Sequence, residues 1–209
     1  SSMAMRAAQA LYEKGLITYM RTDSTTLSAD ALEAARKVIT EKYGKEFCPP
    51  EARTYNKKTK GAQEAHEAIR PAGAEFALPE TVAKECVKSE AQVYELIWQR
   101  TVASQMTDAT GETVQVRVGV TSTAGTATTF SASGTVITHQ GFRKVYIDGD
   151  SDDDETGTAA LPQVAQGDDL NASELEASGH ETQPPSRYTE ASLVKKLEEL
   201  GVGRPSTYA

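Results

Sequence analysis

The sequence is short of cysteine, of long apolar runs and of targeting signals, and each shortage excludes a class of protein. The two cysteines among its 209 residues, Cys48 and Cys86, lie far apart and outside any CxxC pattern, so we expect two reduced thiols. No apolar run approaches the roughly 18 residues that a membrane helix needs. Residues 1–15 lack the basic flank and apolar core of a signal peptide. What remains is an ordinary globular composition, with 25% charged and 38% hydrophobic residues.

The chain also lacks a net positive charge, because its formal charge is -8. The excess acid is confined to residues 101–180, which hold 3 Lys and Arg against 12 Asp and Glu, whereas residues 1–100 hold 15 against 14. Much of it lies in "DGDSDDDE" (148–155), which we interpret as a solvated loop, because it lacks the glycine and the spacing of a calcium-binding hand. Lys57, Lys58 and Lys60 form a local basic cluster. Nucleic acid binding depends on such local fields, so the total charge does not exclude it.

Apolar residues recur at helical spacing through the first hundred residues. The pattern predicts a helix over 1–14 that Gly15 ends, a second from a cap at Ser28 to Gly44, and a third over 89–106. Residues 16–21 between the first two helices are partly β-branched and are predicted to be extended.

After residue 106 the period changes to two, which is typical of strands. We predict strands over 112–120, 126–137 and 142–147, with a last one in 167–177. Pro184 and Pro185 indicate a linker, and a helix is predicted from Thr189 to Leu200. The fold class is therefore α+β, with a helical part followed by a small antiparallel sheet.

The string "GLITYMRTDST" (15–25) places Tyr19 two residues before Arg21, on the same face of an extended segment. A neutral phenol is a poor nucleophile, and a nearby guanidinium favours the phenolate and can also hold a phosphate oxygen. A tyrosine that attacks a phosphodiester needs both effects. The pattern alone favours the simpler interpretation of a strand with an aromatic residue and a surface arginine, because Tyr-x-Arg is a common spacing.

Two further strings carry candidate site residues. In "AQEAHEAIRP", His66 and Arg70 lie four residues apart, and His66 can be a structural residue, a phosphate or proton-handling group, or a metal ligand. The metal interpretation is the weakest, because the HExxH pattern is absent. In "GRPSTYA", Arg204 precedes a helix-start pattern with Ser206 and Thr207, which fits either a helix cap or a phosphate site.

Taken together, the strings "LYEKGLITYMRTDST", "QEAHEAIRP", "VYELIWQRTVASQM" and "PPSRYTEASLVKKLEELGVGRPSTYA" resemble bacterial DNA topoisomerase I, a type IA topoisomerase. The resemblance covers almost the whole chain and is weakest over 110–180. It implies that Tyr19 is the nucleophile that becomes linked to a 5′ phosphate, that Arg21 assists at the scissile phosphate, and that His66 orients or binds it. It also implies that single-stranded DNA is bound by Arg204, Ser206 and Thr207, and we expect Arg70 to bind DNA as well.

The resemblance further implies a toroidal parent enzyme of which this chain is an internal fragment. Residues 1–105 would be the helical domain with the tyrosine, 106–183 part of a β arch, and 184–209 the start of a helical domain beside the DNA groove. The partners implied are single-stranded and negatively supercoiled DNA, with no membrane, and the location is cytoplasmic and nucleoid-associated.

Catalysis in this family also uses Mg²⁺, which the resemblance assigns to an acidic N-terminal domain that this chain lacks, so no metal ligand is expected here. We therefore expect the fragment alone to be inactive. The alternative interpretation is a non-catalytic module that only binds single-stranded DNA as a gate or clamp.

Overall fold

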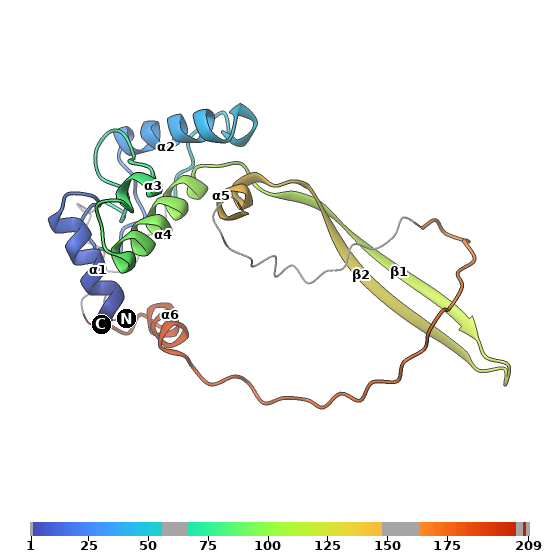
Figure 1. The fold of residues 1–209 in the computed structure, drawn as a ribbon. Coiled ribbons are helices and arrows are strands. Elements are labelled where there is room, and N and C mark those ends of the chain that lie inside the picture. The colour runs from blue at the N-terminus through green and yellow to red at the C-terminus, as the bar shows by residue number, and fades with distance from the viewer. Residues whose placement is uncertain (1, 56–66, 148–163, 204–206, 208–209) are drawn as a thin grey trace. The chain divides into compact units, whose positions relative to one another are not determined.

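The structure, a computed structural model, describes residues 2–55, 67–147, 164–203 and 207 (Figure 1). The chain divides into two compact units, which are described separately. One unit comprises Ser1–Thr110, His139–Asp152 and Thr189–Ala209, and the other comprises Gly111–Thr138 and Asp153–Tyr188. The domain boundaries expected at residues 105 and 183 remain predictions.

Helices make up the regular structure of the first unit. They are α1 (Ser2–Glu13), α2 (Ala29–Lys42), α3 (Pro79–Val82), α4 (Lys88–Ser104), α5 (Lys144–Ile147) and α6 (Glu190–Glu199), with 3-10 turns η1 (Lys45–Phe47) and η2 (Gly141–Arg143). The predicted helices are confirmed as α1, α2, α4 and α6. Ser28 caps α2 by accepting a hydrogen bond from the Ala31 N–H, and Thr189 caps α6 by accepting one from the Ser192 N–H. None of the helices that the structure describes is both long and apolar enough to cross a membrane.

Helix α4 is the centre of this unit, because α1, α2, α3 and α5 all pack against it (Figure 1). Its inward face carries Tyr94, Trp98 and Val102, spaced four residues apart and at most 2% exposed. Leu11 from α1 and Ile39 from α2 are fully buried in the same core cluster. These apolar faces explain why the period of near four in the sequence was a reliable sign of helix.

A glutamine closes the C-terminal end of α4. The fully buried side chain of Gln105 accepts a hydrogen bond from the Arg53 N–H (3.0 Å) and donates one to the Arg53 carbonyl (3.1 Å). The amide therefore pairs with the main chain of residue 53 as a neighbouring strand would. Tyr55 adds a hydrogen bond to the Ser104 carbonyl (2.7 Å), so the chain after α2 is tied to α4 by polar contacts.

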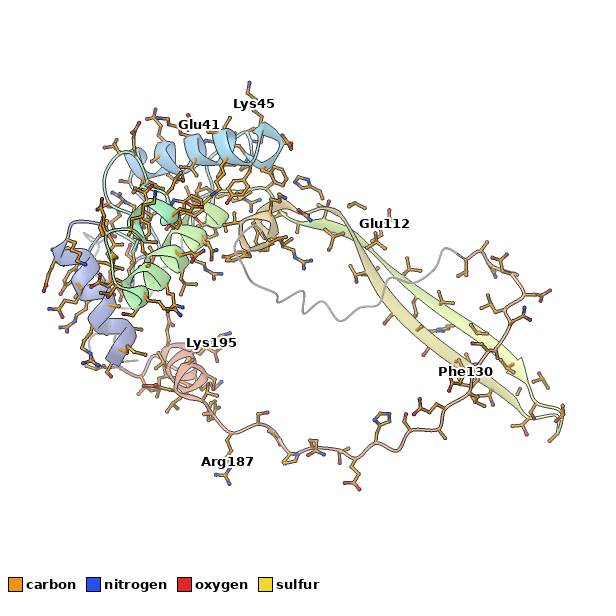
Figure 2. All side chains as sticks on the ribbon, in the orientation of Figure 1. Glu41, Lys45, Glu112, Phe130, Arg187 and Lys195 are labelled. Carbon is orange, nitrogen blue, oxygen red and sulfur yellow. The ribbon has the colours of Figure 1, made fainter. Side chains whose placement is uncertain are left out.

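The second unit contains a two-stranded antiparallel hairpin of β1 (Thr110–Thr121) and β2 (Ala127–His139). Because the chain contains both helices and an antiparallel sheet, the α+β class is confirmed. The alternating valines predicted these strands, but most side chains on both faces are exposed, including Val114, Val120 and Phe130 (Figure 2). A hairpin of two strands has no second layer of its own on which to bury an apolar face.

Two of the predicted strands are wrong. Residues 142–147 form the end of η2 and the helix α5, because Val145 is buried in the helical core and a short apolar run does not distinguish strand from helix. Residues 167–177, all of them described, carry no strand, and Leu170 and Leu175 are exposed. A short run of this kind indicates a strand only weakly, because a strand also needs a partner with which to pair.

The contact between Gln105 and residue 53 leads to a prediction about stability. Gln105→Leu should lower the free energy of unfolding by about 1 to 3 kcal/mol, because it removes both hydrogen-bond partners of the half-buried Arg53 main chain. Chemical denaturation monitored by circular dichroism measures this change. Gln92→Leu, at an exposed position of the same helix, is the matched control and should change stability by less than about 0.5 kcal/mol. Equal losses in the two variants would contradict the role given to Gln105.

Candidate active site

The segment that carries Tyr19 follows directly from the end of α1. Gly15 adopts a positive φ of 70°, its N–H donates to the Tyr12 carbonyl, and the Leu16 N–H donates to the Leu11 carbonyl. This pair of hydrogen bonds ends the helix in the glycine-dependent manner that the sequence predicted. The turn sends the chain along residues 67–73, with Ile17 in an isolated antiparallel bridge to Pro71.

Tyr19 is exposed although the residues around it are anchored. Ile17 and Met20 are buried, at 2% and 7% exposure, whereas the Tyr19 side chain is 42% exposed. Its ring packs edge to face with the ring of Tyr12, with centroids 5.3 Å apart and planes at 69°. The exposure contradicts a buried core role for Tyr19. Strict alternation also fails, because Ile17 and Tyr19 would share one face of an ideal strand.

Arg21 is exposed and has no ion-pair partner among the residues that the structure describes. The hydroxyl-rich residues 22–26 that follow Arg21 form local side-chain turns. The Thr22 hydroxyl accepts a hydrogen bond from the Ser24 N–H (3.1 Å), and the Ser24 hydroxyl accepts one from the Thr26 N–H (3.2 Å). Residues 22–25 line a hollow of about 590 Å³, together with Tyr55 and Arg100. Arg21 is not among the residues that line this hollow, whose lining also includes the carboxylates of Asp23, Asp108 and Glu198. An exposed guanidinium without a carboxylate partner can still bind a phosphate group.

Arg70 has a different environment, because it is 9% exposed and its guanidinium is occupied. Nε and Nη2 donate to the two Glu67 carboxylate oxygens at 2.7 and 3.0 Å, and Nη1 donates to the carbonyls of Pro71 (2.8 Å) and Gly73 (3.2 Å). Residues 67–70 contain no helix, and residue 66 lies outside the described residues, so the structure does not test the relation expected between Arg70 and His66. DNA binding by Arg70 remains a prediction, and the geometry gives this residue a structural task.

Sequence reasoning missed Thr18, whose hydroxyl donates to the Ala68 carbonyl (2.7 Å) and accepts from the Arg70 N–H (2.9 Å). It also missed the Glu67–Arg70 pair, which opposite charges three residues apart could have indicated. His66, Arg204 and Ser206 lie outside the described residues, as do Lys57, Lys58 and Lys60. Thr207 is exposed in a turn. The predicted roles of these residues stay predictions.

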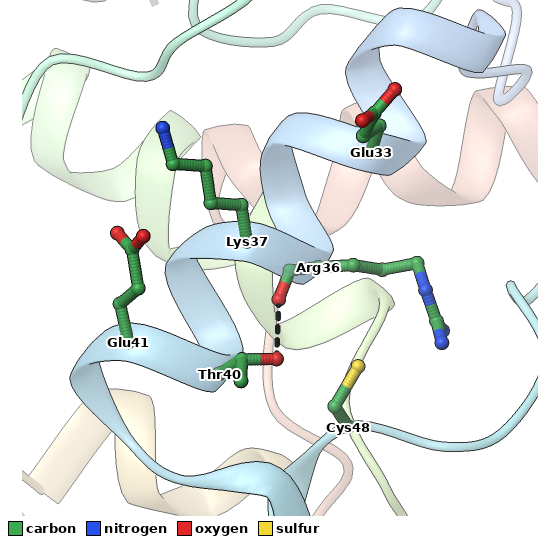
Figure 3. Close-up of a pocket in the computed structure, with 6 residues that line it drawn as sticks. All are labelled: Glu33, Arg36, Lys37, Thr40, Glu41 and Cys48. Atoms are coloured by element: carbon green, nitrogen blue, oxygen red, sulfur yellow. Dashed lines mark hydrogen bonds between the residues drawn. The ribbon is translucent and has the colours of Figure 1, made fainter.

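A second hollow, of about 520 Å³, lies along α2 and contains no comparable chemistry. Glu33, Arg36, Lys37, Thr40, Glu41 and Cys48 line it, and the Thr40 hydroxyl is satisfied within the helix by the Arg36 carbonyl at 2.9 Å (Figure 3). No group of three His, Cys, Asp or Glu among the described residues is arranged to hold a metal ion. No step of the chemistry below is assigned to a metal ion.

Comparison with known proteins gives one consistent answer. A family profile described as DNA topoisomerase matches residues 1–209. The chain is 52% identical over 216 residues to DNA topoisomerase 1 of Mycolicibacterium smegmatis, with 100% of this chain and 23% of the relative covered. It is 54% identical over 208 residues to the Streptomyces coelicolor protein of the same name, with 98% and 22% covered. The chain thus spans less than a quarter of the length of these relatives.

A solved structure agrees with these sequence relatives. Full-length topoisomerase I from Thermotoga maritima matches with a TM-score of 0.68 and 35% identity, over 98% of this chain and 32% of that one. The match extends over both the helical elements and the hairpin, since nearly the whole chain is covered.

The environment of Glu67 predicts how stability depends on pH. Burial by itself raises the pKa of this carboxyl, but hydrogen bonds from Arg70 and Ser28 and the charge of Arg70 outweigh burial and lower the pKa below its usual value. The unfolded chain then binds the proton more readily, so Glu67 stabilises the native state above the unfolded pKa and loses this effect as the pH falls through the folded pKa.

Glu67→Gln should accordingly be destabilising near neutral pH, and its difference from the unmodified chain should shrink as the pH falls from about 6 to about 3. Urea unfolding at several pH values measures the difference. Glu51→Gln changes an exposed carboxylate that has no partner among the described residues, and it controls for the loss of one negative charge. A Glu67→Gln difference that is constant over this range would refute the assignment.

Proposed function

Because the chain belongs to the bacterial type IA DNA topoisomerase family, we propose that it carries the DNA-cleaving tyrosine of an enzyme that relaxes negatively supercoiled DNA. The observation that carries the proposal is the exposed Tyr19 phenol, held on a segment whose neighbours Ile17 and Met20 are buried. A nucleophile that attacks a macromolecule must reach solvent while its backbone stays fixed. Both conditions are met at residue 19.

In the proposed reaction, the Tyr19 oxygen attacks the phosphorus of one DNA strand. A bond from this oxygen to the 5′ phosphate forms as the bond from phosphorus to the 3′ oxygen breaks. The phenol proton is lost, and the departing 3′ oxygen takes up a proton to become a hydroxyl. Attack by that hydroxyl on the phosphotyrosine reverses the exchange, so no ATP is needed for resealing. While the strand is open, the intact strand passes through the gap.

Arg21 would stabilise the negative charge that develops on the phosphoryl oxygens. Its exposure and the lack of a carboxylate partner among the described residues support this role, because an unpaired guanidinium is available to bind phosphate bidentately. His66, by family resemblance, would contact the same phosphate. Arg204, Ser206 and Thr207 would bind the single strand that leads to the site, in a cytoplasmic, nucleoid-associated enzyme.

The proposed nucleophile can be tested with a closely matched control. In the full-length protein that contains this chain, Tyr19→Phe should abolish covalent DNA adducts, because it removes the attacking oxygen, while non-covalent binding of DNA stays within about twofold. Denaturing gel electrophoresis of a labelled oligonucleotide detects the adduct. Tyr12→Phe removes the hydroxyl of the neighbouring ring, which is equally exposed at 42%, and should leave adduct formation intact. Adducts that persist in Tyr19→Phe would refute the proposal.

The 209-residue chain by itself should not relax DNA. We expect Mg²⁺ to be held by an acidic N-terminal domain, as in the family that the chain resembles, and not by the residues of this chain. With Mg²⁺ and supercoiled plasmid, we expect no relaxation and only weak, salt-sensitive binding of a single-stranded oligonucleotide, as in a gate or clamp module. Gel electrophoresis of the plasmid and fluorescence anisotropy of the oligonucleotide measure the two properties. Relaxation by the purified chain would overturn this expectation.

A further inference from the structure

Thr18, directly before the proposed nucleophile, uses its N–H and its hydroxyl to bind one segment of backbone. Its N–H donates to the Arg70 carbonyl (3.0 Å), and its hydroxyl donates to the Ala68 carbonyl (2.7 Å) while accepting from the Arg70 N–H (2.9 Å). The Ala72 N–H adds a hydrogen bond to the Leu16 carbonyl at 2.9 Å. The main chain leading into Tyr19 therefore takes its position from residues 68–72.

The shape of that segment is set by an ion pair. The guanidinium of Arg70 donates two hydrogen bonds to the carboxylate of Glu67, one to each oxygen. It also donates to the carbonyls of Pro71 and Gly73. Such a planar fork fixes direction as well as distance. Glu67 in turn accepts from the N–H of Ser28 (2.9 Å), the residue that caps α2. A continuous polar connection thus runs from the start of α2 through Glu67 and Arg70 to Thr18.

We propose that Glu67 and Arg70 are positioning residues that hold the backbone before Tyr19 in the geometry needed for attack on phosphorus. The proposal rests on the proposed function, in which Tyr19 is the nucleophile. Displacement at phosphorus requires the attacking and departing oxygens to lie in line, so a small shift of the tyrosine slows the reaction even when DNA remains bound. Arg70 itself does not touch DNA in this proposal, because it is buried and its donors are occupied.

Direct contact between Arg70 and a DNA phosphate, as the sequence suggested, has a different signature. Loss of one phosphate contact weakens binding and reduces the slope of log affinity against log salt by about 0.7 to 1. Loss of a positioning residue leaves both quantities unchanged and lowers the rate of cleavage. Affinity and rate therefore separate the two roles.

The experiment uses the full-length protein with Mg²⁺ and a labelled single-stranded oligonucleotide. Single-turnover cleavage is measured at saturating enzyme, and affinity is measured over a range of salt in a Tyr19→Phe background, where no cleavage interferes. Glu67→Gln and Arg70→Gln should each slow cleavage by about tenfold or more, with affinity and salt slope within experimental error of the parent. The double variant should be no slower than the slower single variant, because the two side chains act as one pair.

Matched controls come from the same unit. Glu75→Gln removes the carboxylate of an exposed ion pair, Lys37–Glu75 (2.7 Å), and should leave the cleavage rate unchanged. Thr18→Val removes the hydroxyl and should slow cleavage by about tenfold, whereas Thr18→Ser retains it and should restore most of the rate. Thermal melting shows whether the Glu67 and Arg70 variants are folded. If they are not, the comparison of Thr18→Val with Thr18→Ser tests the positioning role instead.

Three results would overturn the inference: wild-type cleavage rates in Glu67→Gln and Arg70→Gln, a weakened affinity with a reduced salt slope in Arg70→Gln, or equal rates in Thr18→Val and Thr18→Ser. Each differs from failure of the proposed function, which would appear as adducts in Tyr19→Phe. Normal cleavage in the positioning variants, with none in Tyr19→Phe, would remove only the positioning role.

Discussion

The site depends on how one short segment is anchored. Ile17 and Met20 are buried in the helical core, and the Thr18 backbone and hydroxyl are hydrogen bonded to residues 68–70, so the main chain is fixed on both sides of Tyr19. The tyrosine ring is left outside this anchor, in edge contact with Tyr12. Fixed backbone and free phenol together are what a nucleophile needs when its target is a large, separately bound strand.

The two arginines near this segment illustrate how burial divides the work between like charges. Arg21 is exposed, and its guanidinium has no carboxylate partner in the part of the chain that is described. Arg70 is buried, and Glu67 neutralises it. An exposed, unpaired cation can act on a phosphate, whereas a buried, paired cation is better suited to hold a loop in shape. Under the proposed function, Arg21 would take part in the chemistry and Arg70 would hold the geometry of the loop.

The sequence predicted best where a pattern was long and its cause local. The helices at 2–13, 29–42 and 88–104 follow from apolar periodicity and from signals such as Ser28 and Gly15, and the hairpin follows from alternating valines. It failed at 142–147, where burial of Val145 in the helical core accompanies a helix, and at 167–177, where the residues are exposed and not paired with a strand. Tyr19 and Arg21 were proposed from a motif. The Glu67–Arg70 pair was missed although its members are only three residues apart, whereas the hydrogen bonds of the Thr18 hydroxyl to residues 68 and 70 could not be predicted, because they join segments about fifty residues apart in the sequence.

The most direct test of this account maps the site of attachment to DNA. Covalent complexes of the full-length protein with a single-stranded oligonucleotide are trapped with denaturant, digested with protease and nuclease, and analysed by tandem mass spectrometry. We expect a nucleotide on the peptide that contains "GLITYMR", with the added mass of the nucleotide located on Tyr19. A nucleotide on Tyr12, on a hydroxyl of residues 22–26 or on any other side chain would contradict it.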